Sequence, residues 1–224
     1  MKLNQNTIDT LKNFSEINTN ILIKPGKTLS TISTMRNIFA KAEITEEFTS
    51  EFGIYDLNEF LAVVTSTNKP ELSLSDKYMT IAAEGSKSKT KYFYSDPSVI
   101  VSPTKEVNMP EADVTFTLSE SNLKELLKMA AVLKTPDMAL IGTKGGDIVL
   151  KVCDKKNDTS NNFDITVAEG APADFTFYFK VENLKMFPGD YDVSVSSKSI
   201  SHFQNKKLPI QYWIALEPDS RISK

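Results

Sequence analysis

The order of helical and strand-like segments is repeated along the 224-residue chain, and this duplication restricts the fold more than any other feature. Each half has an apolar helical stripe, then strand-like segments, then a second helical window, then further strands. Ile8 and Leu11 of the first stripe correspond to Leu123 and Leu126 in the second half. A repeat of this kind predicts two similar domains. The alternative is the weak self-similarity that β-rich chains often show.

Strand signals dominate both halves. Short segments rich in β-branched and aromatic residues, bounded by polar turns, are typical of strands. A Gly-Gly pair at residues 145–146 predicts a tight hairpin turn. The expected strands are 20–24, 38–44, 51–55, 72–75, 78–82 and 91–94, then 113–118, 139–142, 147–152, 163–167, 175–179, 191–196 and 210–216.

Four helical windows interrupt the strands, two in each half. Their apolar residues recur at the i, i+3, i+4, i+7 spacing of a helix that packs one face on a core. Residues that can cap a helix precede three of them. The windows begin behind Asn6, behind Asp56, behind Ser119 or Ser121, and at Val181, the last being short and ending at Pro188. The predicted class is therefore α+β, with two helices packed on β-sheet in each of two similar domains.

Proline placement suggests where the two domains meet. Pro97, Pro103 and Pro110 favour an extended connector. We therefore predict an N-terminal domain over residues 1–95, a connector over 96–110 and a C-terminal domain over 111–224.

The sequence carries little chemistry for catalysis. It contains one cysteine, Cys153, and one histidine, His202, which is too few for a convergent acid–base or nucleophilic site or a cysteine-based metal site. Residues 142–146 also lack the spacing of a phosphate-binding loop. We expect no catalytic residue, no metal and no cofactor, and hence a binding or structural role.

Charge and hydropathy narrow that role. The net charge is -3, so no overall basic field draws the protein onto nucleic acid, and DNA binding would require lysines gathered on one surface. No apolar run approaches the ~18 residues of a membrane span. We expect a cytoplasmic protein with no membrane partner.

Five short segments, spread over nearly the whole chain, support a more specific interpretation. They are Leu11–Phe14 with Ile17-Asn18, Ile54–Asn58 with Phe60-Leu61, Asp96–Ser98 with Val101 and Pro103, Pro188–Tyr191, and Ala215–Glu217 with Asp219-Ser220. In their order and spacing these segments resemble the sliding clamps, the DNA polymerase processivity factors, of tailed phages. Residues 24–40 and 155–162 diverge from that pattern.

The resemblance implies the DNA clamp fold and a closed homotrimeric ring whose helices line a central hole around duplex DNA. With helices about 10 Å wide set side by side, twelve helices from three chains leave a hole of about 28 Å, whereas eight from two chains leave about 15 Å. The implied partners are the replicative DNA polymerase, through its C-terminal peptide, and an ATP-dependent clamp loader, in the host cell cytoplasm during infection.

The resemblance also suggests residues for three surfaces. Lysines on or beside the helices are expected to face DNA without sequence preference: Lys2, Lys12, Lys124, Lys128, Lys134, Lys180 and Lys185. The subunit interface is expected to join Val107 and Met109 to Phe163 and Ile165. The pocket for partner peptides is expected to be lined by Val99, Ile100, Val101, Ala215, Leu216 and Pro218.

Two other functions stay open at this point. A duplicated β-rich phage structural protein would have no DNA-facing lysines and no polymerase partner. A single-stranded DNA binder would combine a basic groove with exposed stacking aromatics, whereas most aromatic residues here fall in apolar, strand-like segments.

Overall fold

The structure is a computed structural model that describes residues 1–223. The chain divides into two compact units, Met1–Glu106 and the part from Val107 onward. The boundary falls inside the predicted connector, so that residues 96–106 belong to the first unit. Within residues 1–223, none of the helices combines the length and apolar character that crossing a bilayer would require.

The first unit places two helices beside antiparallel strands. The helices are α1 (Gln5–Ile17) and α2 (Leu57–Ser66). The strands are β1 (Ile21–Ile23), β2 (Gly26–Ile32), β3 (Ile38–Phe48), β4 (Phe52–Ile54), β5 (Pro70–Leu74), β6 (Tyr78–Ala83) and β7 (Lys89–Phe93), and the 3-10 turn η1 (Pro97–Val99) follows. β1 pairs with β4, β2 pairs with β3, and the third sheet has the order β5-β6-β7.

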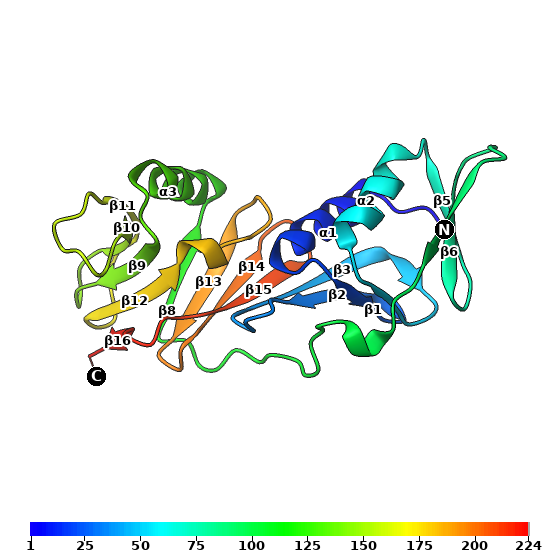
Figure 1. Ribbon diagram of the computed structural model, residues 1–224. Helices are drawn as coiled ribbons and strands as arrows, with labels where there is room; N and C mark the ends of the chain where they lie inside the picture. Colours follow the sequence, from blue (N-terminus) through cyan, green and yellow to red (C-terminus); the bar gives the residue numbers. More distant parts are fainter. Residues whose placement is uncertain (224) are drawn as a thin grey trace. The chain divides into compact units, whose positions relative to one another are not determined.

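The core of the first unit lies beneath its helices. Asn4 caps α1 by accepting a hydrogen bond from the Thr7 N–H at 2.8 Å. The buried side chains of Leu11 and Phe14 turn the apolar stripe of α1 inward. α1 and α2 lie side by side, and α1 packs on β2 and β3 (Figure 1).

The second unit has one α-helix, α3 (Glu120–Leu133), among its described residues, together with the 3-10 turn η2 (Val181–Asn183). Its strands are β8 (Val114–Leu118), β9 (Asp137–Gly142), β10 (Ile148–Cys153), β11 (Phe163–Ala168), β12 (Phe175–Lys180), β13 (Tyr191–Ser196), β14 (Ile200–Asn205), β15 (Ile210–Ala215) and β16 (Arg221–Ile222). One sheet has the order β11-β10-β9-β12-β16, and the other strands pair in the order β15-β14-β13-β8.

Helix α3 covers β10 and β11 (Figure 1). The largest buried side chains of this unit are aromatic, among them Phe177, Phe179, Tyr191 and Tyr212. Gly145, at a φ of 76°, forms the turn between β9 and β10, so the predicted hairpin is confirmed. The α+β class and the thirteen expected strands are confirmed as well, with ends shifted by a few residues.

The fourth predicted helix is wrong, because only the turn η2 forms there. Its window is short, and helices of so few residues are marginal without tertiary support. The backbone of Phe187 is also engaged elsewhere, since its N–H donates to the Tyr212 hydroxyl and its carbonyl accepts from the Tyr191 hydroxyl. The prediction of two helices in each domain is therefore correct only for the first unit.

The sequence did not predict β2, β14 and β16. Strand β14 turns Ser201, Phe203 and Asn205 inward, and two polar residues in core positions hide the period-2 pattern. The cap of α1 is Asn4 rather than Asn6. The caps Asp56 and Ser119 are as predicted.

Candidate functional site

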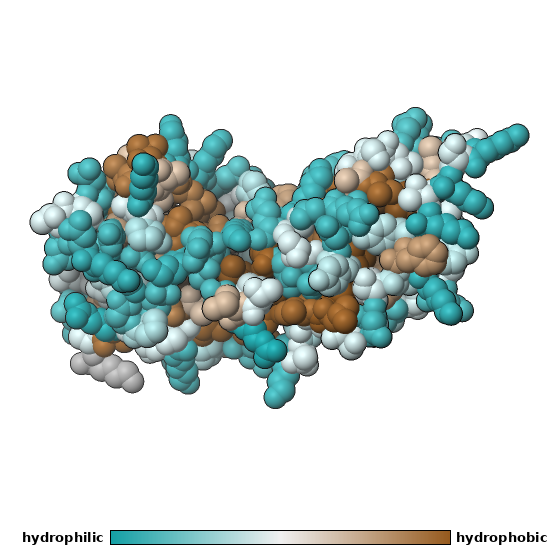
Figure 2. Space-filling view, viewed as in Figure 1, coloured by the Kyte–Doolittle hydropathy of each residue, from teal (hydrophilic) through white to brown (hydrophobic). Residues whose placement is uncertain are grey.

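Helix α3 presents lysines on the face opposite its core contacts. Lys124 and Lys128 are exposed, while Leu123 and Leu126 are buried. Lys134 follows in the left-handed conformation that ends the helix. Among residues 1–223 none of these three lysines forms an ion pair, although the same helix also carries Glu120 and Glu125. Figure 2 shows hydrophilic side chains projecting over α3.

The helices of the first unit have a different exposed face. Lys12 is exposed on α1, and its Nζ lies 3.4 Å from a carboxylate oxygen of Asp9, one turn earlier. Helix α2 exposes Asn58 and Glu59 and contains no lysine. The helical surface of this unit is therefore polar rather than basic.

Lys2 and Lys185 lie outside the helices. The Lys2 ammonium lies 3.0 Å from Glu84 and 3.3 Å from Glu71, and the hydrogen bond to Glu84 raises the pKa of Lys2. Lys185 is exposed in the segment after η2. The predicted lysine set thus separates into unpaired residues on α3 and residues in other settings.

Lys180 has a structural role, because it forms an ion pair with a buried carboxylate. It is the last residue of β12, and its Nζ donates to Asp137 at 2.6 Å. Asp137 is 1% exposed, and this hydrogen bond is the main cause that raises the pKa of Lys180. Because the ammonium compensates a buried carboxylate, we remove Lys180 from the DNA-facing set.

Replacing Lys180 by methionine is expected to lower the free energy of unfolding by about 3 kcal/mol, because a buried carboxylate would lose its cation. Chemical denaturation measures the change. The control is Lys156→Met at an exposed loop lysine, which should stay within about 0.5 kcal/mol of the parent. Equal stability of the two variants would show that the Lys180–Asp137 pair contributes nothing.

The connector half of the predicted peptide pocket is anchored to the first unit. Ile100 is only 7% exposed. The Asn18 side-chain amide donates to the Val101 carbonyl at 3.1 Å, and the Val101 N–H donates to the Asn20 side chain at 3.0 Å. Val99, at 54% exposure, is the residue of the three that offers an open apolar surface.

The C-terminal half of that pocket belongs to the second unit. Leu216 is 6% exposed, and its N–H donates to the Ser199 carbonyl. Ala215 is half-buried and Pro218 is exposed. Ile100 and Leu216 are thus core residues, and polar substitutions there would test folding rather than binding.

The predicted interface residues have unequal settings. Phe163 and Ile165 lie on β11, the edge strand of its sheet, with half-buried side chains. Val107 and Met109 lie in a segment without regular structure. In the first unit, β7 ends its sheet with one side unpaired, as does β2. Pro110, next to Met109, has no N–H that it could donate to a strand ladder.

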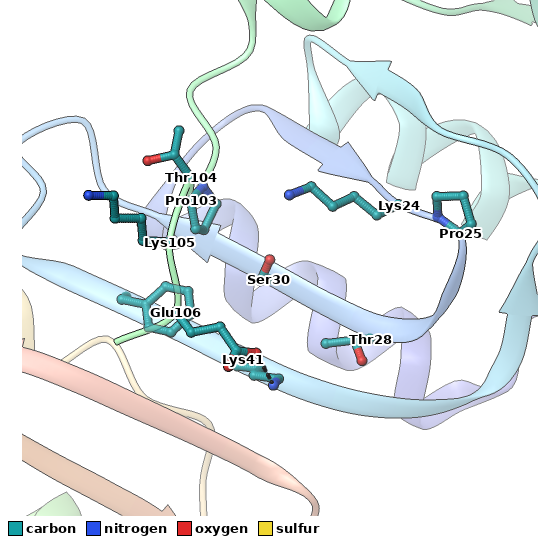
Figure 3. Close-up of a pocket in the computed structure, with 10 residues that line it drawn as sticks. Lys24, Pro25, Thr28, Ser30, Lys41, Pro103, Thr104, Lys105 and Glu106 are labelled. Atoms are coloured by element: carbon teal, nitrogen blue, oxygen red, sulfur yellow. Dashed lines mark hydrogen bonds and ion pairs between the residues drawn. The ribbon is translucent and has the colours of Figure 1, made fainter. Parts of the chain in front are cut away.

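A cavity that the sequence did not predict lies where the connector crosses β2 and β3 (Figure 3). We call it the connector groove, and its volume is about 290 Å³. It is lined by Lys24, Pro25, Thr28, Ser30, Phe39, Lys41 and residues 103–106. Strand β2, which the sequence did not reveal, supplies two of these residues, so no linear pattern could have identified the groove.

Solved structures share this fold. The proliferating cellular nuclear antigen (PCNA) of Entamoeba histolytica aligns with a TM-score of 0.67 at 14% identity, covering 94% of each chain. The PCNA of A. fulgidus, solved with the C-terminal region of FEN-1 bound, aligns with a TM-score of 0.68 at 13% identity, covering 96% of each chain. The chain therefore has the fold of PCNA.

Sequence comparison is more specific. Residues 2–102 match the family described as DNA polymerase processivity factor, and residues 115–218 match the C-terminal domain of the gp45 sliding clamp. The sliding clamp of Vibrio phage KVP40 is 31% identical, covering 97% of this chain and 99% of that one. Those of Escherichia phage RB69 and Enterobacteria phage T4 are 31% and 30% identical, each covering 98% of both chains. The chain belongs to the sliding clamp family of phages, and the predicted resemblance is confirmed.

Proposed function

We propose that three copies of this chain close into a ring around duplex DNA and tether the replicative polymerase to its template. The observation that supports the ring most strongly is an uncovered strand edge in each unit. An unpaired edge exposes backbone donors and acceptors that another chain can satisfy. Two different edges on one chain favour head-to-tail pairing, which closes if the rotation permits.

β7 in the first unit and β11 in the second each end a sheet with one side unpaired, as β2 and β8 also do. At the opposite edge of the first sheet, the Leu72 N–H of β5 donates to the Met1 carbonyl at 2.8 Å. At the opposite edge of the second sheet, β16 pairs with β12. We therefore propose β7, rather than Val107 and Met109, as the partner of Phe163 and Ile165 on β11.

Charge supports the same pairing. Lys89 and Lys91 lie on β7, whereas Asp164 lies on β11 and Glu169 follows directly after it. Opposite charges across paired strands are stabilising, while like charges are destabilising. Pairing of β7 with β7, or of β11 with β11, is disfavoured for that reason.

The earlier estimate of hole size, which assumed four helices per chain, no longer favours a trimer. Residues 1–223 contain three α-helices, and nine helices side by side would leave a hole of only about 19 Å by the same estimate. The proposal of three copies therefore rests on the family and on the two complementary edges.

A closed ring needs no tight contact with DNA, because topology holds it in place. The unpaired lysines Lys124, Lys128 and Lys134 on α3 supply a sequence-independent attraction that still permits sliding. The chain then acts with no catalysis of its own, in the cytoplasm of the infected cell, and an ATP-dependent loader opens the ring.

For the polymerase peptide, exposed Val99 and half-buried Val101 of the first unit are the contacts we propose. Extended, proline-flanked apolar segments suit the capture of a short peptide, since they cannot fold back into a helix.

The assembled mass tests the ring directly. The chain has a mass of 25.0 kDa, and light scattering at tens of micromolar protein should give three times that value. A protein that is entirely monomeric at that concentration would contradict the homotrimer.

A further inference from the structure

A short segment of the second unit covers one edge of its five-stranded sheet. Residues 217–223 run beside β12, and we call them the strap (Figure 1). The Glu217 N–H donates to the Tyr178 carbonyl at 2.8 Å, and the Tyr178 N–H donates to the Ser220 hydroxyl at 2.9 Å. Farther along the strap, β16 pairs with β12. The strap therefore satisfies backbone groups of β12 that would otherwise form an open strand edge.

The strap buries little apolar surface. Leu216, directly before it, is 6% exposed, whereas each of residues 217–223 is half-buried or exposed. Segments that are held by hydrogen bonds and charges, with few buried apolar contacts, open locally at a lower free energy than the core. Opening of the strap is therefore separable from unfolding of the unit.

A largely buried lysine joins the strap to a neighbouring loop. Lys155 lies between β10 and β11, and its side chain is 11% exposed. Its Nζ lies 2.7 Å from a carboxylate oxygen of Asp219 and 3.2 Å from one of Glu217. The hydrogen bond from Lys155 lowers the pKa of Asp219. Because so little of the ammonium is in contact with water, the two carboxylates of the strap supply its compensation.

Other contacts hold Lys155 in place without the strap. Its backbone N–H donates to the Asp137 carboxylate at 3.2 Å, and its Nζ lies 5.3 Å from the centre of the Tyr178 ring. Asp137 is buried and also accepts a hydrogen bond from Lys180. Lys155 thus belongs to the body of the unit, and the strap is the part that can leave it.

We propose that the strap is a releasable cover of the β12 edge, held closed by Lys155, and that it opens while the rest of the second unit stays folded. Opening breaks the two carboxylate contacts of Lys155 and leaves the backbone groups of Thr176 and Tyr178 on that edge unpaired. The strap thus controls whether β12 can pair with an extended segment of another chain. The device lies within one unit and does not require a closed ring.

Hydrogen exchange of the intact protein, resolved amide by amide, tests the strap. Because hydrogen-bonding direction alternates along a strand, the Tyr178 N–H points to the strap, whereas those of Phe177 and Phe179 point to β9. In the parent, the Tyr178 amide should be less protected than these two. Lys155→Met should accelerate exchange at Tyr178 roughly tenfold and leave Phe177 and Phe179 unchanged.

Lys156→Met, at the exposed neighbouring lysine, is the matched control and should change none of the three amides. Asp219→Asn removes a partner from the strap side and should accelerate exchange at Tyr178 to a smaller extent. Combined with Lys155→Met it should add nothing, because the contact is already lost.

The proposal is overturned if Lys155→Met leaves the Tyr178 amide as protected as in the parent. It is also overturned if the Tyr178, Phe177 and Phe179 amides exchange only together, since the strap would then open only when the unit unfolds. If Lys155→Met unfolds the unit, Asp219→Asn decides alone, and an unchanged Tyr178 amide in that variant contradicts the proposal.

Discussion

Replacing Lys91 by proline is expected to convert the assembled ring into monomers while the fold of each chain persists. The Tyr94 N–H donates to the Lys77 carbonyl at 3.0 Å. Because hydrogen-bonding direction alternates along a strand, Lys91 points its N–H away from β6 and toward the free edge. Proline removes that donor and is tolerated where the N–H faces outward. Light scattering should show the 25.0 kDa chain, and processive synthesis should be lost.

Lys91→Ala is the matched control. The Lys91 ammonium lies 4.8 Å from the centre of the Tyr78 ring, and both variants lose this contact, but only proline loses the backbone donor. The alanine variant should therefore keep most of the trimer. A proline variant that assembles as the parent does would show that β7 is not the interface strand.

Charge reversal of Lys124 and Lys128 together is expected to slow loading onto DNA by about tenfold at moderate salt, because electrostatic steering toward the helical face would be lost. The dependence of loading on salt should also become shallower, as fewer phosphates are neutralised. The assembled mass and thermal stability should hardly change, since exposed lysines contribute little to folding.

Charge reversal of Lys156 and Lys207 provides the control, because both are exposed lysines of the second unit outside α3. This variant carries the same change in net charge and should load like the parent. If the α3 variant also supports processive synthesis like the parent, these lysines do not face the hole.

The sequence revealed the features that local patterns determine. The helix caps Asp56 and Ser119 bond to residues close to them in sequence. Asp56, for example, accepts hydrogen bonds from the N–H groups two and three residues later. Strands in which every second residue is buried, such as Val114–Leu118, also follow from a local sequence pattern. The duplication and the spacing of family segments extended these signals to the whole fold.

Features that depend on distant neighbours were missed or misplaced. Val181–Phe187 has a helical stripe, but Tyr191 and Tyr212 engage the backbone of Phe187. Lys180 resembled a helix-flanking lysine until Asp137, 43 residues away in sequence, was seen beside it. Ile100 was predicted to line the peptide pocket, whereas its side chain is buried beside Gly53. A sequence pattern shows the type of each residue and the spacing of apolar residues. Neither of these reveals a contact with a residue that is distant in sequence.

Retention on closed and cut DNA is the most direct measurement of whether this chain acts as a ring. The protein is loaded onto nicked circular duplex by its loader, separated from free protein in high salt, and followed after a restriction enzyme linearises the DNA. We expect it to stay on the circle, because salt weakens charge contacts but not topology, and to leave once free ends exist. Equal retention on circular and linear DNA, or loss from both at the same salt concentration, would contradict the account.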